Sequence, residues 1–598
     1  EIGHGKTLSK ARIPPGRQAT RRAATHGANV RKLSAGFQRR DESVCPMNQM
    51  RTFLIFAWLM VATILWMNWN KEQNAPPTPT QAAQAAVSSA TVPEGLPPPA
   101  VPGAVPVAVP TATTPAVNGQ PAIATQIGPT PAASPRMTLS NDVLRLSLDG
   151  GSVRRAELLR YRASRAPDAP LVRLFDETAE NFYIAQSGWT SAQGAPSHQT
   201  GFVAEQPATE FKLADGAKTI SASFVWAGAD GVSIRRTYTL ARGEYALKVR
   251  DEVDNRGTKP WTGHIYRYLS RVPRVLKRGM TNPESYSFNG AVWYTPKEKY
   301  EKRAYDDFVD DGQLNITTDG GWIALLQHYF FAGWIPQADQ KANFALANAG
   351  NQFGITATGP EFTVAPGTRA SSAATLWIGP KLPEQLAKQA PGFERALDYG
   401  IFTFLAEPIH WLLAKLHLVT GNWGWAIMLL VLLIKLALYP LSAAQYKSMA
   451  KMRKFQPRMQ QLKERYGDDK QKYQTAMMEL YKKEKINPAG GCLPILIQMP
   501  VFLALYWVLI ESVELRQAPW MLWIHDLTAR DPFFILPAIN MAVMWFTQRL
   551  TPMVGVDPIQ QRMFQMMPLI FGVMFAFFPA GLVLYWATNG TLGMLQQL

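Results

Sequence analysis

The amino-acid sequence predicts a multi-pass α-helical membrane protein that also carries a large β-sandwich domain. Three observations support this fold class. Apolar runs of membrane-spanning length occur near the N-terminus and through the last third of the chain, short alternating segments fill the middle, and basic blocks flank the apolar runs. With 598 residues, the chain is long enough for several domains.

The positive charge is concentrated in two blocks. The formal net charge is +17; residues 1–51 hold eleven Lys or Arg against three acids, and residues 442–490 hold twelve against five. Both blocks flank apolar runs, as cytoplasmic segments of membrane proteins do, and neither is interleaved with aromatic residues like a nucleic-acid platform. Cys45 and Cys492 are far apart, so we expect neither a disulfide framework nor a metal site.

The basic N-terminal block predicts a disordered tail. Residues 1–51 are polar, and such a composition cannot build a core. Met47 and Met50 lie directly before the first apolar run, and either is a natural start of translation. We therefore expect residues 1–46 to be an artefact of the assigned start, at least in part.

The first apolar run predicts a membrane anchor, which a spacer follows. Residues 52–69 come after Arg51, and Asn68 to Lys71 do not form an A-x-A cleavage site. An uncleaved anchor with a cytoplasmic N-terminus is therefore favoured over a cleaved signal peptide. Residues 70–136 are rich in proline and alanine, which favours an extended linker.

Residues 137–385 predict an antiparallel β-sandwich. Segments such as Ile220–Trp226 and Val232–Leu240 alternate with the period of a strand, and turns such as Asp149-Gly150-Gly151 separate them. Because the domain follows the anchor, we expect it outside the cytoplasm. Its tryptophans are expected mainly in the core, and the alternative is a sugar-binding surface that includes Trp261, Trp293, Trp322 and Trp334.

Residues 391–418 predict an amphipathic helix at the membrane interface. Apolar residues alternate there with ionisable ones such as Glu407, His410 and Lys415, which an interface tolerates better than the bilayer core. Topology agrees, because both basic blocks belong in the cytoplasm and an even number of crossings must separate them.

Residues 423–441 predict the second transmembrane helix, and one charge, Lys435, interrupts this apolar run. An ammonium group in hydrocarbon costs roughly 2.5–3.5 kcal/mol on insertion scales, so its presence suggests a function. The alternative is snorkelling, because Lys435 lies six residues from Leu441, or about 9 Å along a helix.

The basic block at 442–490 predicts a cytoplasmic helical hairpin. Its apolar residues recur at spacings of three and four, the seam of paired helices, and Gly467 marks the turn between them. The hairpin either has a solvent-exposed charged surface without a binding function, or it binds ribosomal RNA, anionic lipid or a nascent chain. The candidate residues on it are Met452, Phe455, Met459, Tyr473, Met477 and Glu484.

Residues 493–598 contain four further apolar runs, which bring the predicted number of spans to six. The loop 511–532 has more acidic than basic residues and is expected outside, whereas Arg549 and Arg562 mark the next loop as internal. The last two spans are short, which implies tilt or local thinning of the bilayer. The four runs are Leu493–Ile510, Phe533–Phe546, Met563–Phe578 and Leu582–Leu598.

Enzyme signatures are missing from the sequence. It contains no H-E-x-x-H, no G-x-S-x-G and no phosphate-binding G-x-x-x-x-G-K-[ST] pattern, so we expect no enzymatic activity, no cofactor and no metal. Asn540 and Asn589 lie inside spans, where helix–helix hydrogen bonding is the simpler interpretation. The many methionines of this half either fill core gaps or form a surface that adapts to different apolar segments.

Several long motifs resemble the YidC/Oxa/Alb family of membrane protein insertases. The resemblance extends over residues 47–598 in arrangement and over 420–598 in motif detail. It implies that 137–385 form the periplasmic β-supersandwich of Gram-negative members, and that the last five spans enclose a hydrophilic groove. The motifs are GNWGWAIMLLVLLIKLALYPLSAAQYKSMAKM, ERYGDDKQKY, NPAGGCLPILIQMPVFLALYWVL, SVELRQAPWMLWIHDL and FPAGLVLYWATN.

The resemblance also implies the residues of the site. One positive residue, usually arginine, occupies the groove in this family, and Lys435 stands at that position here. Lysine keeps the charge but lacks the bidentate fork of arginine. The residues implied to contact the passing substrate are Gln498, Met499, Pro500, Phe502, Tyr585 and Trp586.

The expected function is the insertion of nascent proteins into the inner membrane of a Gram-negative bacterium. The expected partners are these nascent chains, the Sec translocon, the ribosome with the signal-recognition pathway, and membrane lipids, without any specific nucleic-acid sequence. Family members often end in a basic tail that helps to bind ribosomes; this sequence ends at Leu598 without one. Either the tail is missing or the hairpin makes that contact.

Two other functional classes are less consistent with the sequence. A secondary transporter should have two halves with matching interrupted helices, and no such repeat occurs. A membrane-anchored carbohydrate-processing protein would need paired catalytic carboxylates within 137–385 and would leave five further spans unexplained.

Overall fold

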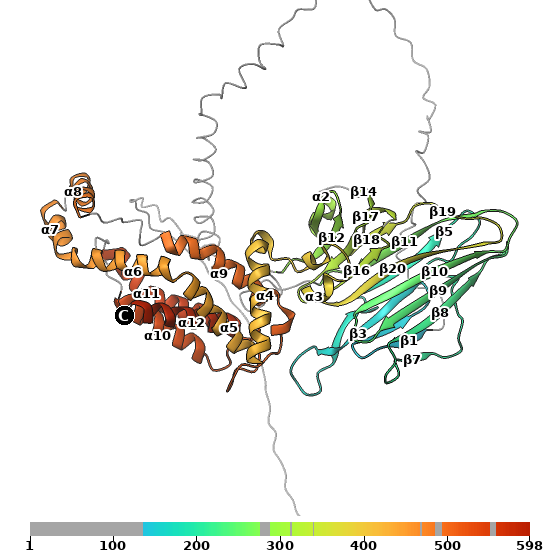
Figure 1. Ribbon diagram of the computed structural model, residues 1–598, viewed down its shortest axis with the longest axis horizontal. Coiled ribbons are helices and arrows are strands. Elements are labelled where there is room, and N and C mark those ends of the chain that lie inside the picture. Colours follow the sequence, from blue (N-terminus) through green and yellow to red (C-terminus); the bar gives the residue numbers. More distant parts are fainter. Residues whose placement is uncertain are drawn as a thin grey trace, which may run out of the picture. The chain divides into compact units, whose positions relative to one another are not determined.

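The computed structural model describes residues 136–274, 287–310, 314–338, 340–466, 469–484, 493–550 and 558–597. The predicted tail (1–51), the anchor (52–69) and the linker as far as residue 135 lie outside the described residues. The described chain consists of β-strands up to Pro380 and mainly of helices after it (Figure 1).

Two sheets form a β-sandwich, which agrees with the predicted fold of this region (Figure 1). All strand pairs are antiparallel except β1 with β7. The first sheet has the order β14-β17-β18-β11-β5-β3-β2-β1-β7, with β4 paired to β3 and β19 to β11. Its strands are β1 (Met137–Ser140), β2 (Leu144–Leu148), β3 (Ser152–Arg162), β4 (Leu171–Phe175), β5 (Tyr183–Thr190), β7 (Glu210–Lys212), β11 (Trp261–Arg271), β14 (Asn315–Asp319), β17 (Lys341–Ala349), β18 (Gln352–Thr358) and β19 (Phe362–Val364).

The second sheet has the order β13-β12-β15-β16-β20-β10-β9-β8-β6. A short helix, α2 (Asp307–Asp310), follows its strand β13. Its strands are β6 (Val203–Ala204), β8 (Thr219–Ala227), β9 (Val232–Ala241), β10 (Ala246–Asn255), β12 (Gly290–Thr295), β13 (Lys299–Ala304), β15 (Trp322–Leu326), β16 (Phe330–Pro336) and β20 (Thr368–Pro380).

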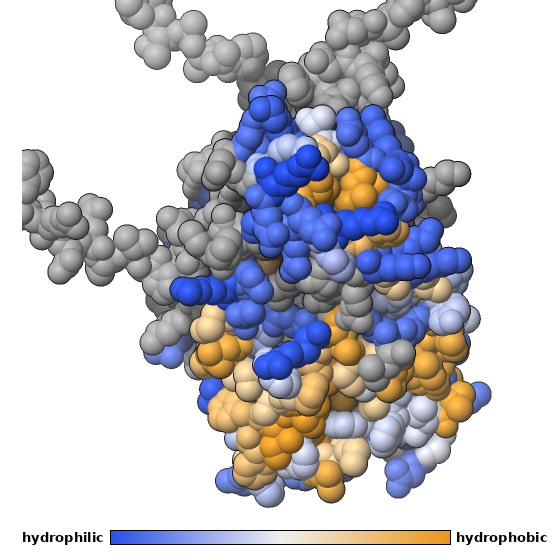
Figure 2. Space-filling model, turned by 90° about the vertical axis from the view of Figure 1, so that its left-hand side faces the viewer, coloured by the Kyte–Doolittle hydropathy of each residue, from blue (hydrophilic) through white to orange (hydrophobic). Residues whose placement is uncertain are grey.

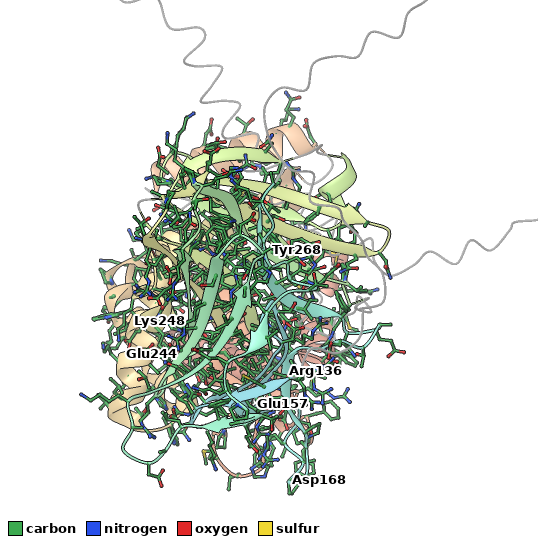
Figure 3. All side chains as sticks on the ribbon, turned by 90° about the vertical axis from the view of Figure 1, so that its right-hand side faces the viewer. Arg136, Glu157, Asp168, Glu244, Lys248 and Tyr268 are labelled. Atoms are coloured by element: carbon green, nitrogen blue, oxygen red, sulfur yellow. The ribbon has the colours of Figure 1, made fainter. Side chains whose placement is uncertain are left out.

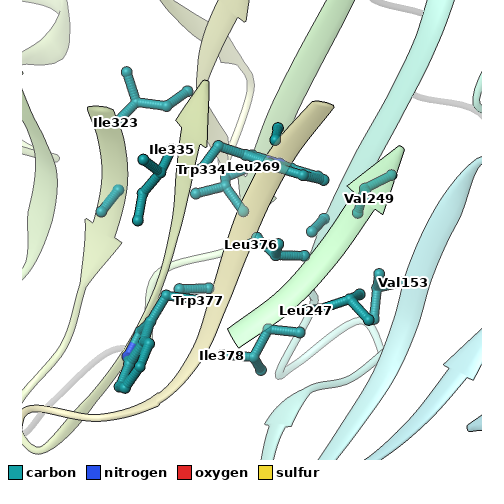
Figure 4. Close-up of a cluster of buried hydrophobic side chains, with 14 of the residues drawn as sticks. Val153, Leu247, Val249, Leu269, Ile323, Trp334, Ile335, Leu376, Trp377 and Ile378 are labelled. Atoms are coloured by element: carbon teal, nitrogen blue, oxygen red, sulfur yellow. The ribbon is translucent and has the colours of Figure 1, made fainter. Parts of the chain in front are cut away.

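The core of the sandwich lies between the two sheets. Strand β9 alternates buried with partly exposed or exposed residues, which is the pattern that one buried face produces. Val153 of one sheet and Leu247 and Val249 of the other are buried and belong to the same hydrophobic cluster, part of which Figure 4 shows. Charged residues such as Glu244 and Lys248 lie on the outside (Figure 3).

The tryptophans considered for a sugar-binding surface belong to this core. Each of the four is at most 5% exposed. Three of them donate their indole N–H to backbone carbonyls: Trp261 to Gly194, Trp322 to Pro391 and Trp334 to Tyr268. Core packing, and not a surface site, is therefore their role.

A buried ion pair within the second sheet also hydrogen-bonds to the first sheet. Arg236 of β9 and Asp251 of β10 are 0% and 1% exposed, and their two contacts are 2.7 and 2.6 Å long. From the other sheet, the Trp189 indole donates to Asp251 at 2.7 Å, and the Ser187 carbonyl accepts from Arg236 at 2.9 Å. Because every charge finds partners, this network is compatible with an apolar core.

The second part of the chain is helical. Its core is formed mainly by α4, α5, α9, α10 and α12, and α11 packs against α10. The elements are α3 (Pro383–Leu386), the 3₁₀ turns η2 (Phe393–Ala396) and η3 (Gly400–Phe402), α4 (Thr403–Thr420), α5 (Trp423–Ala437), α6 (Tyr439–Lys454), α7 (Gln456–Tyr466), α8 (Lys470–Lys483), α9 (Leu493–Glu511), the 3₁₀ turn η5 (Val513–Leu515), α10 (Ile535–Leu550), α11 (Pro558–Phe575) and α12 (Ala580–Gln597).

The single helix predicted over 391–418 is wrong in its first part. Two 3₁₀ turns precede α4, which begins only at Thr403. Gly392 and Gly400 interrupt the helix, because both adopt the left-handed conformation with φ of 73° and 62°. The helix α4 packs against α5 and α9 and exposes large apolar side chains such as Phe404 and Trp411 on its other side.

The segment 423–441, predicted as one span, bends at Leu438 in the structure. The halves α5 and α6 meet at 64°. Pro440 explains the break, since it has no amide hydrogen and its ring would crowd the carbonyl of Leu436 in a continuous helix. Within the described residues, no helix taken alone combines the length and apolarity of a span, whereas Trp423–Ala437 with Tyr439–Lys447 does so jointly.

The remaining helix bounds differ modestly from the prediction. The run predicted to begin at Phe533 becomes helical only at Ile535, because Phe534 has a φ of 57°. The predicted cytoplasmic hairpin corresponds to α6, α7 and α8, with α7 packed against α8. Asp469 caps α8 by accepting hydrogen bonds from two backbone amides at 3.2 and 3.1 Å.

A second buried ion pair attaches the sandwich to α9. Lys381, just after β20, lies 3.2 Å from Glu511 at the end of α9, and the two side chains are 1% and 2% exposed. Ser287 also donates to Glu511 at 2.6 Å, and His328 donates to the carbonyl of Ile510 at 3.0 Å. These contacts fix the last turn of α9 against the sandwich.

We predict that Glu511→Ala destabilises the protein by about 3–5 kcal/mol, because it leaves the Lys381 ammonium buried without its partner. The double variant Lys381→Met/Glu511→Leu should recover most of that loss, because it removes both charges. Thermal unfolding in detergent measures both effects. The control is Lys415→Ala, which disrupts an exposed contact to Glu384; a Glu511→Ala protein as stable as this control would contradict the prediction.

A half-buried histidine, His198, gives the sandwich a pH dependence. The backbone amide of His198 donates to the Tyr266 hydroxyl at 3.0 Å, and the same hydroxyl shares a hydrogen bond with His198 Nδ1 at 2.8 Å. Burial of the imidazole lowers the pKa of His198 from 6.5 to about 4.

We predict that the protein loses stability as the pH falls from about 6.5 to about 4, since the unfolded chain then binds a proton that folded His198 does not. The full loss is up to about 3 kcal/mol at roughly 1.4 kcal/mol per pKa unit. His198→Asn should flatten this part of the profile. Melting temperatures of both proteins at pH 7 and near pH 4 decide the matter, and identical profiles would contradict it.

Candidate functional site

Lys435 lies in the last turn of α5, beside a glycine of α12. A Cβ atom at Gly593 would stand 3.5 Å from both the Lys435 ammonium and the Tyr446 hydroxyl, so the two polar groups meet over a position without a side chain. Tyr446 of α6 donates to the Gly593 carbonyl at 3.1 Å. Lys435 is half-buried, and it has no ion-pair partner among the described residues.

Helix α12 continues this polar face toward its middle. Asn589 is one turn from Gly593 and accepts a hydrogen bond from Gln498 of α9 at 3.4 Å. Asn540 of α10 is 2% exposed and lies beside Gly590, and its Nδ2 has no hydrogen-bond partner among the described residues. The polar groups of α5, α6, α9, α10 and α12 thus gather along one stretch of α12.

Aromatic side chains lie on the other side of Asn589 along α12. Phe502 of α9 stacks on Trp586 with ring centroids 5.6 Å apart and an angle of 18°, and it lies 5.8 Å from Tyr585. Phe575 and Phe578 contact the same Trp586 ring at 4.2 and 5.4 Å. The three predicted aromatic contact residues therefore form one cluster between α9 and α12.

The predicted contact residues differ in their exposure. Gln498, Met499, Pro500, Phe502 and Trp586 are half-buried. Tyr585 is only 4% exposed, so in this structure it packs into the cluster and supports Phe502.

Apolar residues that form the seam of the hairpin are buried or half-buried between its own helices. Met459 of α7 is 2% exposed, whereas Phe455, Tyr473 and Met477 are half-buried. Glu484 accepts a hydrogen bond from Arg458 at 2.9 Å, which ties the end of α8 to α7. Met452 lies in α6.

Two surfaces of different polarity meet on the helical part. In Figure 2 the upper surface, over α7 and α8, is mostly hydrophilic, whereas hydrophobic residues gather on the lower surface. The helices α10 and α11 contribute many exposed large apolar residues; these are Ile535, Ile539, Trp545, Phe546, Met563, Phe564, Met566, Leu569, Ile570 and Val573. Such an apolar exterior is the kind that lipid covers.

Part of this site could not be named from the sequence. Asn540, Asn589 and Gln498 stand out as polar residues in apolar runs, but Tyr446 and Gly593 do not. A usable signal is the pair Gly590 and Gly593, because small residues in a membrane helix allow close approach of polar neighbours. No cluster of His, Cys, Asp or Glu suitable for a metal occurs among the residues that the structure describes.

Comparisons with known proteins agree on one family. Residues 136–412 match the family model of the YidC periplasmic domain, and residues 415–598 match that of the 60Kd inner membrane protein. The protein named membrane protein insertase YidC from Xanthomonas campestris pv. campestris is 57% identical over 555 residues, which cover 92% of this chain and 96% of the relative.

Another relative and one solved structure complete the comparison. Membrane protein insertase YidC from Stenotrophomonas maltophilia is 56% identical over 560 residues, covering 92% of this chain and 96% of the relative. A crystal structure described as an active YidC insertase with its first transmembrane domain resolved covers 78% of this chain and 92% of its own, with 19% identity and a TM-score of 0.35.

Proposed function

This chain belongs to the YidC family of membrane protein insertases, and from the polar face of α12 we propose how it transfers its substrates. It is an inner-membrane insertase with a periplasmic β-sandwich, and its substrates are membrane proteins. The observation that carries the mechanism is Lys435, half-buried without an ion-pair partner among the described residues.

The proposed topology has six spans with the N-terminus in the cytoplasm. The spans are residues 52–69, the bent pair around 423–441, and α9, α10, α11 and α12. The basic hairpin α6–α8 then lies in the cytoplasm, and the α9–α10 loop lies outside with the sandwich. Two features support this arrangement: the exposed apolar side chains of α10 and α11, which suit contact with lipid, and the basic charge of residues 442–490.

In the proposed mechanism, the polar face of α12 borders a wet groove that is open to the cytoplasm. The hydrophilic segment of a substrate enters this groove from the cytoplasmic side. Its hydrogen bonds to bulk water are then replaced by hydrogen bonds to the polar groups around Gly593 and Asn589. This removes part of the free-energy cost of taking polar backbone into hydrocarbon. The Lys435 ammonium attracts acidic groups in that segment, and no bond chemistry is involved.

The apolar segment of the substrate takes a separate path. We place it along Met499, Phe502 and Trp586, from which it leaves into lipid. The hydrophilic segment is released outward, and the membrane potential assists acidic groups by about 2.3 kcal/mol per charge per 100 mV. This path needs no nucleotide.

The hairpin is the proposed site of first contact with a nascent chain. Its apolar seam is occupied within α7 and α8, so its outer surface is basic and suits anionic partners such as the ribosome. We also propose that the protein acts beside the Sec translocon and that the signal-recognition pathway delivers nascent chains to it.

We predict that Lys435→Ala slows insertion about 30-fold, whereas Lys435→Arg retains most activity. An ammonium about 8 Å from a carboxylate at an effective dielectric constant near 20 gains roughly 2 kcal/mol, which corresponds to that factor. Lys435→Glu should be at least as slow as alanine. Protease protection of an acidic single-spanning substrate in vesicles with purified protein measures the rate.

The matched control for this series is Lys415→Ala, which removes the same charge from an exposed position on α4. It should insert at the wild-type rate. Full activity of Lys435→Ala would reduce Lys435 to a snorkelling residue, and no insertion by the wild type would overturn the insertase function itself.

A second prediction concerns the space over Gly593. Gly593→Ala should be tolerated, because its Cβ makes only ordinary contacts at 3.5 Å with Lys435 and Tyr446. Gly593→Leu should abolish most insertion, because its side chain fills the space between the ammonium and the hydroxyl. Insertion assays at equal protein content test this, and a Leu variant as active as the Ala variant would contradict it.

A further inference from the structure

A cavity lies where the sandwich meets the loop between α9 and α10. It has a volume of about 550 Å³. Residues 163–165, after β3, contribute one wall, and residues of the segment 516–532 contribute another. The Arg516 side chain holds the two together by donating to the Ala163 carbonyl at 3.0 Å.

The lining of this cavity is cationic. It includes the guanidinium groups of Arg165, Arg516 and Arg530 and one carboxylate, that of Asp526. Asp526 is occupied by its own loop, because one of its oxygens accepts hydrogen bonds from two backbone amides and a hydroxyl at 2.8 to 3.1 Å. Arg165 and Arg530 are exposed and have no ion-pair partner among the described residues.

Apolar side chains of the same loop are exposed before and after Arg530 in the sequence. Leu522 is 67% exposed and Phe533 66%, and their neighbours Met521 and Phe534 are 38% and 46% exposed. Leu522 and Phe534 have φ of 54° and 57°, a conformation that residues with large side chains rarely adopt. The loop thus presents apolar groups to the outside although its backbone is strained in doing so.

We propose that this cavity binds the phosphate of an anionic phospholipid headgroup in the outer leaflet. This inference rests on the proposed function, which places the α9–α10 loop at the external membrane surface. Arginine is suited to phosphate because its planar fork donates two hydrogen bonds, and Arg165 and Arg530 supply that group here. The apolar side chains of Leu522 and Phe533 lie among the acyl chains.

The test uses the full chain in vesicles of phosphatidylcholine mixed with phosphatidylglycerol. A photocrosslinking amino acid replaces Leu522, and the measured quantity is the crosslink yield to phosphatidylglycerol relative to phosphatidylcholine at equal mole fraction. The wild-type background should favour phosphatidylglycerol. Arg165→Gln/Arg530→Gln should lower this preference by about fivefold for each arginine removed.

The control Lys248→Gln/Lys259→Gln removes two exposed charges from the sandwich away from this cavity and should keep the preference. Equal yields from both lipids without any substitution, or an unchanged preference in the arginine variant, would overturn the proposal. Competition by excess inorganic phosphate that abolishes the preference would assign the site to free phosphate. Insertion in the same vesicles separates the two proposals, because a protein that inserts without lipid preference refutes only this one.

Discussion

The helical part depends on how one ammonium group is accommodated in an otherwise apolar segment. A cation in hydrocarbon is costly unless water or a polar partner accompanies it. Here α12 offers Gly593, whose missing side chain leaves room for the Lys435 ammonium and the Tyr446 hydroxyl. The arrangement keeps the charge available, because no carboxylate among the described residues pairs with it.

The bend at Leu438 follows from the same region. Pro440 ends α5 close after Lys435, so the ammonium lies in the last turn of this helix and not in its middle. The chain then continues as α6, which brings Tyr446 back to α12. At the opposite end, the Lys381–Glu511 pair holds the last turn of α9 against the sandwich. Helix α9 is therefore fixed at one end, and it contacts α12 through Gln498 and Phe502.

Much of this fold could be predicted from the sequence, because strands and amphipathic helices leave a periodic pattern. The alternation in β9, the apolar run before Lys435 and the seam of the hairpin are all visible in the residues. The breaks were harder to predict. Gly392 and Gly400 divide the segment before α4, and Pro440 bends the second predicted span, although all three stood in the sequence as known helix breakers.

The candidate site could be predicted only in part. Lys435 stands out by itself, whereas its neighbours on α6 and α12 come together through tertiary packing that no local pattern encodes. Tyr585 is the opposite case: the family resemblance implied that it contacts the substrate, but its side chain is buried against Phe502. Family resemblance identifies positions, but the exposure of a side chain depends on its packing.

The most direct test of the account exchanges charges between the protein and its substrate. Insertion rates would be measured for wild type and Lys435→Glu, each with a substrate whose translocated segment carries either one acidic or one basic residue. Attraction by the groove predicts strong coupling: the acidic substrate is favoured by the wild type and the basic one by Lys435→Glu. Additive effects, with the same substrate preferred by both proteins, would contradict an electrostatic role of residue 435.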